Sequence, residues 1–335
     1  MGHDVSALVV GIDGGNSKTD VVLATTEGEI LSTVRGVGTR AYFDGMTTTV
    51  DNVTDLIVRA KVEAGLAADA EVAVAAYFLA NLDTAADEAA FAAQISVKRN
   101  AMTEVVHNDT FAILHAGAPD GWGIAVVCGA GINATGLHPD GRIARFLALG
   151  EMTGDWGGGE GVAMAGLGDA VRAGDGRGPQ TLLRTAVAEH FGMPAEEVAL
   201  AVLEGRLDGD DLHNAAPVVF AAAVAGDTVA TAIVVRLAEE ITTMIVAHLR
   251  TLDLLGQPVP VVLGGGTLQH GPAMLVDGIN TRLATRAPLA STRILDVPPV
   301  TGAVLHALTL AGADGVARRR VRERFRLTHS GVLDD

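Results

Sequence analysis

The chain has 335 residues, a formal net charge of −16 and a single cysteine. This length suffices for two domains with separate cores, whereas one cysteine excludes an intrachain disulfide framework or a metal site built from cysteines. The negative charge disfavours general nucleic-acid binding, which depends on Lys and Arg. Met1–Asp4 leads into an apolar strand too short and glycine-interrupted for a signal peptide, and no apolar stretch is long enough for a membrane span. We therefore expect a cytoplasmic protein without membrane contact.

The first part of the chain, 1–117, predicts an α/β domain that opens with three strands. The apolar run Ala7–Ile12 leads into a glycine-rich turn, Asp20–Ala24 follows, and Ile30–Val34 returns after the turn Glu27–Glu29. The later elements expected in this domain are a helix over Met46–Ala64, a strand over Glu71–Phe78, a helix over Thr84–Gln94, a strand over Thr103–Val106 and a helix over Thr110–Ala116. Gly117–Gly121, which contains Pro119, predicts the domain boundary.

The second part, 118–317, repeats this pattern and adds a helical insertion at about 157–255. Its expected elements are a strand over Gly123–Val127, a short strand to Leu137, a return over Ile143–Leu149, a strand over Val259–Leu263, a helix from about Gly271 and a last core helix over Gly302–Leu310. The last helix could pack back on the first domain. The basic tail, 318–335, begins with Arg318–Arg326, which we interpret as a solvated helix rather than a partner site. Ala- and Val-rich helices between Ala215 and Leu255 either fill the second core or present a homodimer face.

Two glycine-rich turns occupy matching places in the two halves. The first is Asp13–Thr19, and the second is Cys128–Thr135. Glycine allows backbone N–H groups to converge on an anion, and nearby Ser, Thr, Asn or Lys side chains add donors. The repeat favours duplicated α/β halves that clamp a polyphosphate across a cleft. The alternative is two unrelated glycine hairpins.

Acidic residues follow the strands of the first half. Asp13 ends the first strand, where a carboxylate beside a polyphosphate requires a divalent cation such as Mg²⁺; the alternative is an Asp that caps its own turn. Asp109 follows an apolar strand and begins a helix, which suits a general base for a sugar hydroxyl, with Asn108 beside it as a hydroxyl partner. Ordinary helix capping by either residue is the competing interpretation.

Two further glycine-rich segments lie in the second half. Gly150–Gly161 combines many glycines with acids and with Trp156, one of only two tryptophans. It could place Asp155, or less readily Glu151 or Glu160, against sugar hydroxyls, while the tryptophan packs the loop or covers a sugar. Gly264–Thr267 would let a flat base approach the backbone, or simply forms a tight strand-to-helix turn.

At these positions the chain resembles the BadF/BadG/BcrA/BcrD-type ATPases, and within them it is similar to the N-acetylglucosamine kinases of the actin/hexokinase/Hsp70 superfamily. The resemblance extends from about Val9 to Leu310. The motifs that carry it, in this order, are Asp13–Thr19, Asn108-Asp109, Gly129–Asn133, Gly154-Asp155, Gly264–Thr267 and Pro299–Ala303. The resemblance implies two ribonuclease-H-like domains that face a central cleft, with MgATP as phosphoryl donor.

The resemblance also implies roles for single residues. Asp13 matches the Mg²⁺-associated acid and Asp109 the catalytic base, while Asn108 and Asp155 fall at sugar-contacting positions. The positions expected to bind ATP are Gly14, Gly15, Asn16, Ser17, Lys18 and Thr19 in the first loop, Gly129, Ala130, Gly131 and Asn133 in the second, and Gly265, Gly266 and Thr267 in an adenosine turn.

Three positions depart from the family pattern. Arg40 stands where an Asn often binds the sugar, Asn81 lies in a loop that replaces a Ser-Gly-type turn, and Trp156 stands where an acid commonly follows Gly-Asp. We count Arg40 and Asn81 among the substrate-binding candidates. These departures leave phosphoryl transfer intact as the expected chemistry but do not define the acceptor sugar.

Three functions follow from these features. The favoured one is an ATP-dependent kinase that phosphorylates N-acetylglucosamine or a related amino sugar, at the 6-hydroxyl. The second is an ATPase that activates radical dehydratases, which the single cysteine disfavours because such activators bridge an iron–sulfur cluster with cysteines. The third is a non-catalytic sugar or nucleotide sensor.

Overall fold

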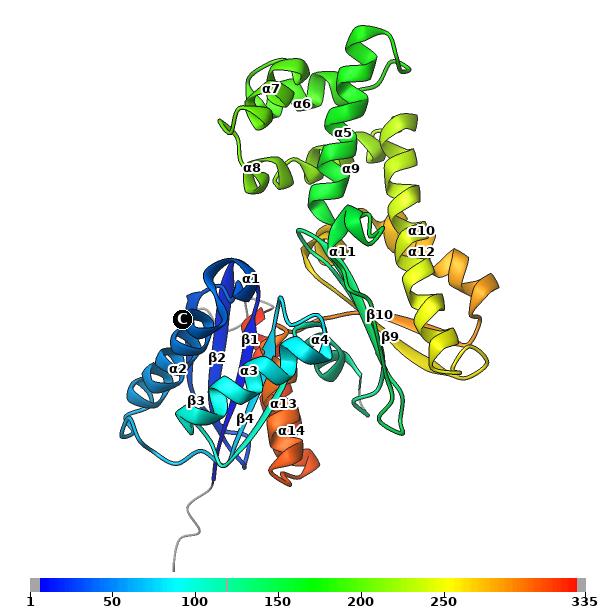
Figure 1. The fold of residues 1–335 in the computed structure, drawn as a ribbon. Coiled ribbons are helices and arrows are strands. Elements are labelled where there is room, and N and C mark those ends of the chain that lie inside the picture. Colours follow the sequence, from blue (N-terminus) through cyan, green and yellow to red (C-terminus); the bar gives the residue numbers. More distant parts are fainter. Residues whose placement is uncertain (1–6, 119, 330–335) are drawn as a thin grey trace, which may run out of the picture. The chain divides into compact units, whose positions relative to one another are not determined.

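The computed structural model describes residues 7–118 and 120–329 (Figure 1). Met1–Asp4, Pro119 and the end of the basic tail, 330–335, therefore lie outside the described residues. The chain divides into two compact units, the first formed by 1–125 and 295–335 and the second by 126–294. This division differs from the sequence-based one, in which residues up to 317 belonged to the second domain.

Each unit contains one sheet with helices. The strands of the first unit are β1 (Leu8–Gly14), β2 (Lys18–Thr25), β3 (Ile30–Val37), β4 (Val74–Leu79) and β5 (Thr103–Asn108). Its helices are α1 (Ala41–Asp44), α2 (Met46–Glu63), α3 (Ala85–Lys98), α4 (Thr110–Gly117), α13 (Val300–Leu310) and α14 (Gly315–His329). The strands of the second unit are β6 (Gly123–Cys128), which crosses the boundary, β7 (Ile132–Leu137), β8 (Ile143–Arg145), β9 (Val259–Gly264) and β10 (Ala290–Ile294). Its helices are α5 (Gly158–Asp175), α6 (Leu183–Phe191), α7 (Ala195–Leu203), α8 (Gly209–His213), α9 (Ala216–Val224), α10 (Thr228–Thr251), α11 (Gly266–His270) and α12 (Ala273–Arg286), with a 3-10 turn at Gly150–Met152.

The two sheets have the same topology. The first has the order β3-β2-β1-β4-β5, and the second has the order β10-β9-β6-β7-β8. Numbered within its own unit, the first sheet reads third, second, first, fourth and fifth strand. The second sheet reads the same when it is taken from β8 to β10, and this is the order of a ribonuclease-H-like sheet. β1 pairs antiparallel with β2 and parallel with β4, so the chain passes from a hairpin into a parallel crossover. The duplicated α/β architecture predicted from the glycine turns is confirmed.

The first unit packs helices on both faces of its sheet. Alternate residues of β1, Val10 and Ile12, lie in one core with α2 and α3. On the other face Gly11 contacts α13, where an added Cβ would lie 2.4 Å from the Val304 nitrogen. Gly302 allows equally close packing of α13 on α4, since its Cβ would lie 1.9 Å from the Ala112 carbonyl oxygen. These close contacts explain why residues 295–317 belong to the first unit.

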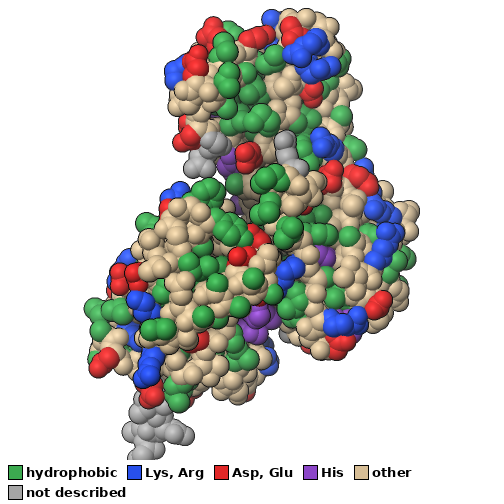
Figure 2. Space-filling model, in the orientation of Figure 1, with side chains coloured by type: hydrophobic (Ala, Val, Ile, Leu, Met, Phe, Trp, Pro, Cys, Tyr) green, Lys and Arg blue, Asp and Glu red, His purple; other side chains and the backbone are tan. Residues whose placement is uncertain are grey.

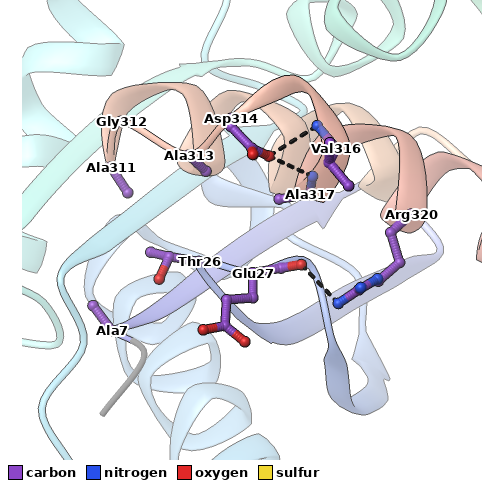
Figure 3. Close-up of a pocket in the computed structure, with 10 residues that line it drawn as sticks. All are labelled: Ala7, Thr26, Glu27, Ala311, Gly312, Ala313, Asp314, Val316, Ala317 and Arg320. Carbon is purple, nitrogen blue, oxygen red and sulfur yellow. Dashed lines mark hydrogen bonds between the residues drawn. The ribbon is translucent and has the colours of Figure 1, made fainter. Parts of the chain in front are cut away.

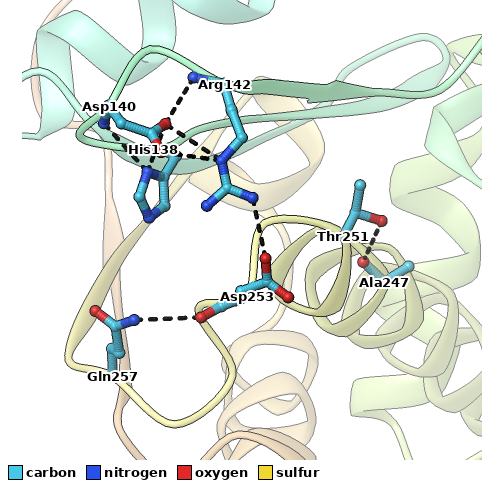
Figure 4. Close-up of polar contacts among 7 residues, drawn as sticks. All are labelled: His138, Asp140, Arg142, Ala247, Thr251, Asp253 and Gln257. Atoms are coloured by element: carbon cyan, nitrogen blue, oxygen red, sulfur yellow. Dashed lines mark hydrogen bonds and ion pairs between the residues drawn. The ribbon is translucent and has the colours of Figure 1, made fainter.

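The second unit combines its sheet with the helical insertion α5 to α10. The apolar face of α10 is buried within the unit. The β7–β8 hairpin is joined to the end of α10, because Arg142 bonds Asp140 within the hairpin and reaches Asp253 at 3.0 Å (Figure 4). β8 ends at Arg145, earlier than the predicted limit Leu149, and Ala148 beyond it takes a left-handed conformation with φ of 50°. β10 was not predicted.

Some of the surface charges form local ion pairs. On the face drawn in Figure 2, Lys and Arg side chains lie among Asp and Glu side chains on both units. Lys98 pairs with Asp51, and Arg282 and Arg286 share Glu239. Within the described residues no single helix has the length and apolar composition of a membrane span; only the bent pair 211–224 and 228–251, at 114°, meets both criteria jointly.

Candidate active site

The predicted site residues of the first unit gather at the carboxyl ends of β1, β4 and β5. These strands are parallel neighbours, and their registers place Asp13 opposite Phe78, and Leu79 opposite Asn108. Asp109 follows directly and donates its backbone N–H to the Leu79 carbonyl at 3.2 Å. Ligands of open α/β sheets collect at such strand ends. The sheet therefore brings Asp13, Asn108 and Asp109 to the carboxyl ends of its parallel strands.

The first glycine turn is shaped by close backbone contacts. The N–H of Gly15 donates to the Lys18 carbonyl at 2.8 Å, and its carbonyl accepts from the N–H of Thr39 at 2.9 Å. A Cβ on Gly14 would lie 2.4 Å from the Thr39 hydroxyl oxygen, so this position requires glycine. Asn16, Ser17 and Lys18 are exposed at the tip of the turn. The turn thus presents polar groups to solvent, while backbone hydrogen bonds of Gly15 fix its conformation.

Thr19 and Asp20, at the start of β2, stabilise this turn through contacts with β3. The Thr19 hydroxyl is 1 % exposed and donates to the Val37 carbonyl at 2.7 Å, so its hydrogen bond supports the hairpin. Asp20 accepts from Arg35 through both oxygens, at 2.6 and 3.0 Å, and lies 3.6 Å from Lys18. The Asp20 carboxylate is therefore paired with both cations of the hairpin.

Asp13 and Asp109 are partly exposed carboxylates surrounded by protein. Burial, followed by the charges of Asp109 and Asp20, raises the pKa of Asp13 well above its usual value. Burial and then the Asp83 carboxylate raise the pKa of Asp109 to about 7, although nearby backbone N–H groups act in the opposite direction. A carboxylate whose pKa is raised to about 7 is suited to accept a proton at neutral pH.

Asn108 and Asp109 differ in their hydrogen bonds at the start of α4. The Asn108 side-chain oxygen accepts from the Thr110 N–H at 3.1 Å and from its hydroxyl at 2.7 Å, so Asn108 bonds the first turn of α4. Its side-chain nitrogen donates to Asp83 at 3.0 Å. Asp109 makes no side-chain cap hydrogen bond. The Asn108 side chain therefore bonds the first turn of α4, whereas the Asp109 carboxylate makes no cap hydrogen bond and interacts with the adjacent backbone N–H groups.

Arg40 and Asn81, the two residues of this unit that depart from the family pattern, have different surroundings. Arg40 is exposed and bonds Asp44 through two nitrogens, at 3.0 and 3.1 Å, one turn later in α1. Asn81 follows β4 with a left-handed φ of 63°, and its side-chain oxygen is buried without a hydrogen-bond partner. A strained, unsatisfied polar side chain beside strand ends is typical of a ligand-binding position.

The second unit brings its own glycine segments together. The Thr267 hydroxyl donates to the Gly129 carbonyl at 3.1 Å, and the N–H groups of Gly159 and Glu160 donate to the carbonyls of Gly129 and Ala130, at 2.7 and 3.0 Å. A Cβ on Gly265 would lie 2.4 Å from the Cys128 carbonyl oxygen. The second glycine turn is therefore packed between the start of α5 and the Gly264–Thr267 turn.

The remaining predicted residues of this unit make local contacts. The Asn133 side-chain oxygen accepts from the Ala134 N–H at 2.7 Å. Asp155 accepts a hydrogen bond from the Thr153 hydroxyl. Trp156 stacks against Arg236 of α10, with the guanidinium carbon 3.8 Å from the ring centroid, which supports packing rather than sugar stacking for this ring. Burial raises the pKa of the Cys128 thiol to about 12.

A cavity of about 610 Å³ lies elsewhere in the first unit, beside the start of α14 (Figure 3). Asp314 accepts from the N–H groups of Val316 and Ala317, at 2.8 and 2.9 Å, and Arg320 donates to the Glu27 carbonyl at 3.1 Å. None of the predicted site residues lines this cavity.

The repeated ribonuclease-H-like sheets, with a glycine turn in each, define an α/β protein of the actin-like ATPase fold class. Residues 10–307 match the model of the BadF/BadG/BcrA/BcrD ATPase family, and the chain belongs to that family.

Similar proteins include kinases of amino sugars. An N-acetyl-D-glucosamine kinase of Dictyostelium discoideum is 24% identical over 317 residues, 90% of this chain and 98% of that protein. An N-acetylmuramic acid/N-acetylglucosamine kinase of Clostridium acetobutylicum is 23% identical, over 78% of this chain and 86% of its own length. The crystal structure of a proposed N-acetylglucosamine kinase from Chromobacterium violaceum has a TM-score of 0.68 at 24% identity, covering 90% of this chain and 99% of that one. The structural similarity supports the same fold.

Sequence reasoning gave no role to Asp83 or Glu88. Asp83 bonds Asn108 and raises the pKa of Asp109, and Glu88 accepts the Asn108 backbone N–H at 3.0 Å. The sequence signal that could have found them is the capping pair Thr84 and Asp87, which marks the start of α3. Asp83 and Glu88 lie directly on either side of this pair.

Proposed function

We propose that this protein phosphorylates N-acetylglucosamine or a related amino sugar, at its 6-hydroxyl, with Asp109 as the general base. The coarser class, an ATP-dependent sugar kinase, rests on the family and on the kinase relatives. The observation that carries the proposal within this chain is the Asp109 carboxylate: it is crowded by protein, has a pKa of about 7 and takes no part in capping α4.

In the proposed reaction the sugar hydroxyl oxygen attacks the γ-phosphorus of ATP. The new oxygen–phosphorus bond forms as the bond to the β,γ-bridging oxygen breaks, ADP leaves, and the hydroxyl proton passes to Asp109. The backbone of the two glycine turns would bind the phosphates, and Gly265, Gly266 and Thr267 the adenosine. Asn81, Asp155 and Arg40 are the proposed sugar contacts. Asn108 is proposed to hold the turn that carries the base.

Asp13 is the proposed Mg²⁺ ligand, directly or through water. The described residues contain no group of three or more His, Cys, Asp or Glu side chains suited to a metal, whereas Mg²⁺ bound with a nucleotide needs only one or two carboxylates besides phosphate and water. The raised pKa of Asp13 fits this role, because a cation would favour its ionised form. When bound, Mg²⁺ neutralises charge on the transferring phosphoryl group.

The test is ADP release with a panel of sugars, with and without Mg²⁺. The panel contains N-acetylglucosamine, N-acetylmannosamine, N-acetylmuramic acid, glucosamine and glucose. Release that requires one amino sugar and Mg²⁺ supports the kinase, and mass spectrometry of the product locates the phosphate. Sugar-independent release would instead indicate an ATPase, and binding without release a sensor.

A further inference from the structure

β5 is an edge strand, and its last residue has a backbone donor that the sheet leaves unused. The sheet order ends with β5 beside β4. The N–H of Asp109 points inward, to the Leu79 carbonyl at 3.2 Å. The N–H of Asn108 points away from β4, because successive residues of a strand alternate, and it donates to the Glu88 carboxylate at 3.0 Å.

We propose that Glu88 is a positioning residue for Asp109, which fixes the turn carrying the base by holding the Asn108 backbone. This inference rests on the proposed function, since it takes Asp109 as the base. Glu88 lies in the first turn of α3, where an acidic side chain is favoured by the free N–H groups of the helix start. Its carboxylate thereby links the start of α3 to the end of β5.

The surroundings give Glu88 a restricted geometry. Its side chain is 13 % exposed, and the start of α3 is fixed by the reciprocal bonds of Thr84 and Asp87. The other polar groups of Asn108 are held by Asp83 and Thr110. With Glu88 in place the backbone N–H and both side-chain polar atoms of Asn108 are bonded, and the proposed base is the next residue. Small displacements of a catalytic group cost large factors in rate.

A second role for Glu88 is an ion pair with His107, whose Nδ1 lies 3.8 Å from the same carboxylate oxygen. The two roles differ in what they need from residue 88. Holding an N–H requires only an oxygen acceptor, which a glutamine amide supplies, whereas an ion pair requires the negative charge. Glu88→Gln therefore separates the two roles without removing the side chain's bulk.

The experiment compares Glu88→Ala, Glu88→Gln and the control Glu63→Ala, which removes an exposed glutamate paired with Arg59 on α2. We expect Glu88→Ala to lower kcat by about 10- to 100-fold while KM for ATP changes by less than about twofold, because the glycine turns are untouched. Glu88→Gln should restore kcat to within about threefold of wild type, and Glu63→Ala should match wild type. Equal loss in Glu88→Gln and Glu88→Ala would overturn the proposal in favour of the ion pair.

A second readout does not depend on turnover. Hydrogen exchange of the amide of Asn108, followed by NMR or in a peptide over residues 103–111, should accelerate at least about tenfold in Glu88→Ala and remain slow in Glu88→Gln. Unchanged exchange in Glu88→Ala would overturn the proposal by itself. If wild type releases ADP with a sugar and Asp109→Asn does not, yet Glu88→Ala retains full kcat, the positioning role fails while the proposed function stands. Absence of sugar-dependent release in wild type contradicts the proposed function instead.

Discussion

The Asp13 and Asp109 carboxylates, from the ends of β1 and β5, are close enough for the charge of Asp109 to raise the pKa of Asp13. Burial acts on both in the same direction. Two partly desolvated carboxylates resist simultaneous ionisation unless a cation lies with them. The pair therefore suits a site in which one acid faces a metal–phosphate group and the other accepts a proton, and it makes the site sensitive to pH.

Asp109→Asn should lower kcat by about 10²- to 10⁴-fold, the usual contribution of a general base. The amide has nearly the same shape, so the affinity for ATP should change by less than about threefold in calorimetric titration. The matched control is Asp51→Asn, an exposed acid paired with Lys98 on the same unit, which should retain wild-type kcat. Full turnover of Asp109→Asn would refute the assignment of the base.

Asp83→Asn should move the acidic limb of the pH profile to lower pH. The base must be ionised to act, so kcat/KM for the sugar should fall about tenfold per unit as the pH drops below about 7, the pKa of Asp109. The Asp83 charge contributes to that raised pKa, and an asparagine still accepts the Asn108 bond. The measurement is kcat/KM at pH 5.5–8.5. We expect Asp83→Asn to have a higher kcat/KM than wild type at pH 6 and the same value on the plateau above pH 7. An acidic limb at the wild-type position would contradict the prediction.

Asp109→Asn should also stabilise the fold at alkaline pH. A carboxyl whose pKa rises on folding costs stability progressively as the pH increases from about 4 to about 7, and the full cost remains above pH 7. At about 1.4 kcal/mol per pKa unit, the rise from 3.8 to about 7 corresponds to at most about 4.5 kcal/mol at pH 8, and the cost is smaller at pH 5. Thermal unfolding of both proteins at these two pH values tests this. An equal Tm difference at pH 5 and pH 8 would argue against a raised pKa.

Much of the fold is predictable because its signals are local. Each glycine turn follows an apolar run, and tight hairpin turns such as Glu27–Glu29 mark the returning strands. The duplication of this pattern predicts two similar sheets, and both sheets have the same strand order. The placement of Asp109 after β5 was predictable for the same reason, since a polar pair directly follows an apolar strand.

The remaining features depend on contacts between distant segments. β10 reads Ala-Ser-Thr-Arg-Ile, with little apolar periodicity, and becomes a strand because β9 offers a parallel edge. The placement of α13 in the first unit depends on Gly11 and Gly302, whose roles appear only when the helix meets the sheet. Likewise, Glu88 gains its contact with Asn108 from the packing of α3 beside β5, which no local sequence pattern encodes.

Gly302→Ala should destabilise the first unit. Alanine in a helix is favoured over glycine by about 1 kcal/mol, but the new Cβ would lie 1.9 Å from the Ala112 carbonyl oxygen, which is backbone and must be displaced. Such overpacking typically costs about 1–3 kcal/mol. The Tm should therefore fall by several degrees, whereas the control Gly256→Ala, with no atom within 4 Å of its new Cβ, should leave Tm nearly unchanged. A raised Tm in Gly302→Ala would show that α13 moves freely away from α4.

Cys128 should behave as an inert buried thiol, which separates the kinase from an iron–sulfur activator. The side chain is buried in the second unit, and its pKa of about 12 keeps it protonated at neutral pH. Since the thiolate is the reactive and metal-binding form, the native protein at pH 8 should react with a chromogenic disulfide at least about 100-fold more slowly than the unfolded chain. After denaturation one thiol per chain should titrate. The control is Cys128→Ser, which should show no reaction in either state. Rapid labelling of native protein, or an iron–sulfur absorption band after anaerobic purification, would favour the activator over the sugar kinase.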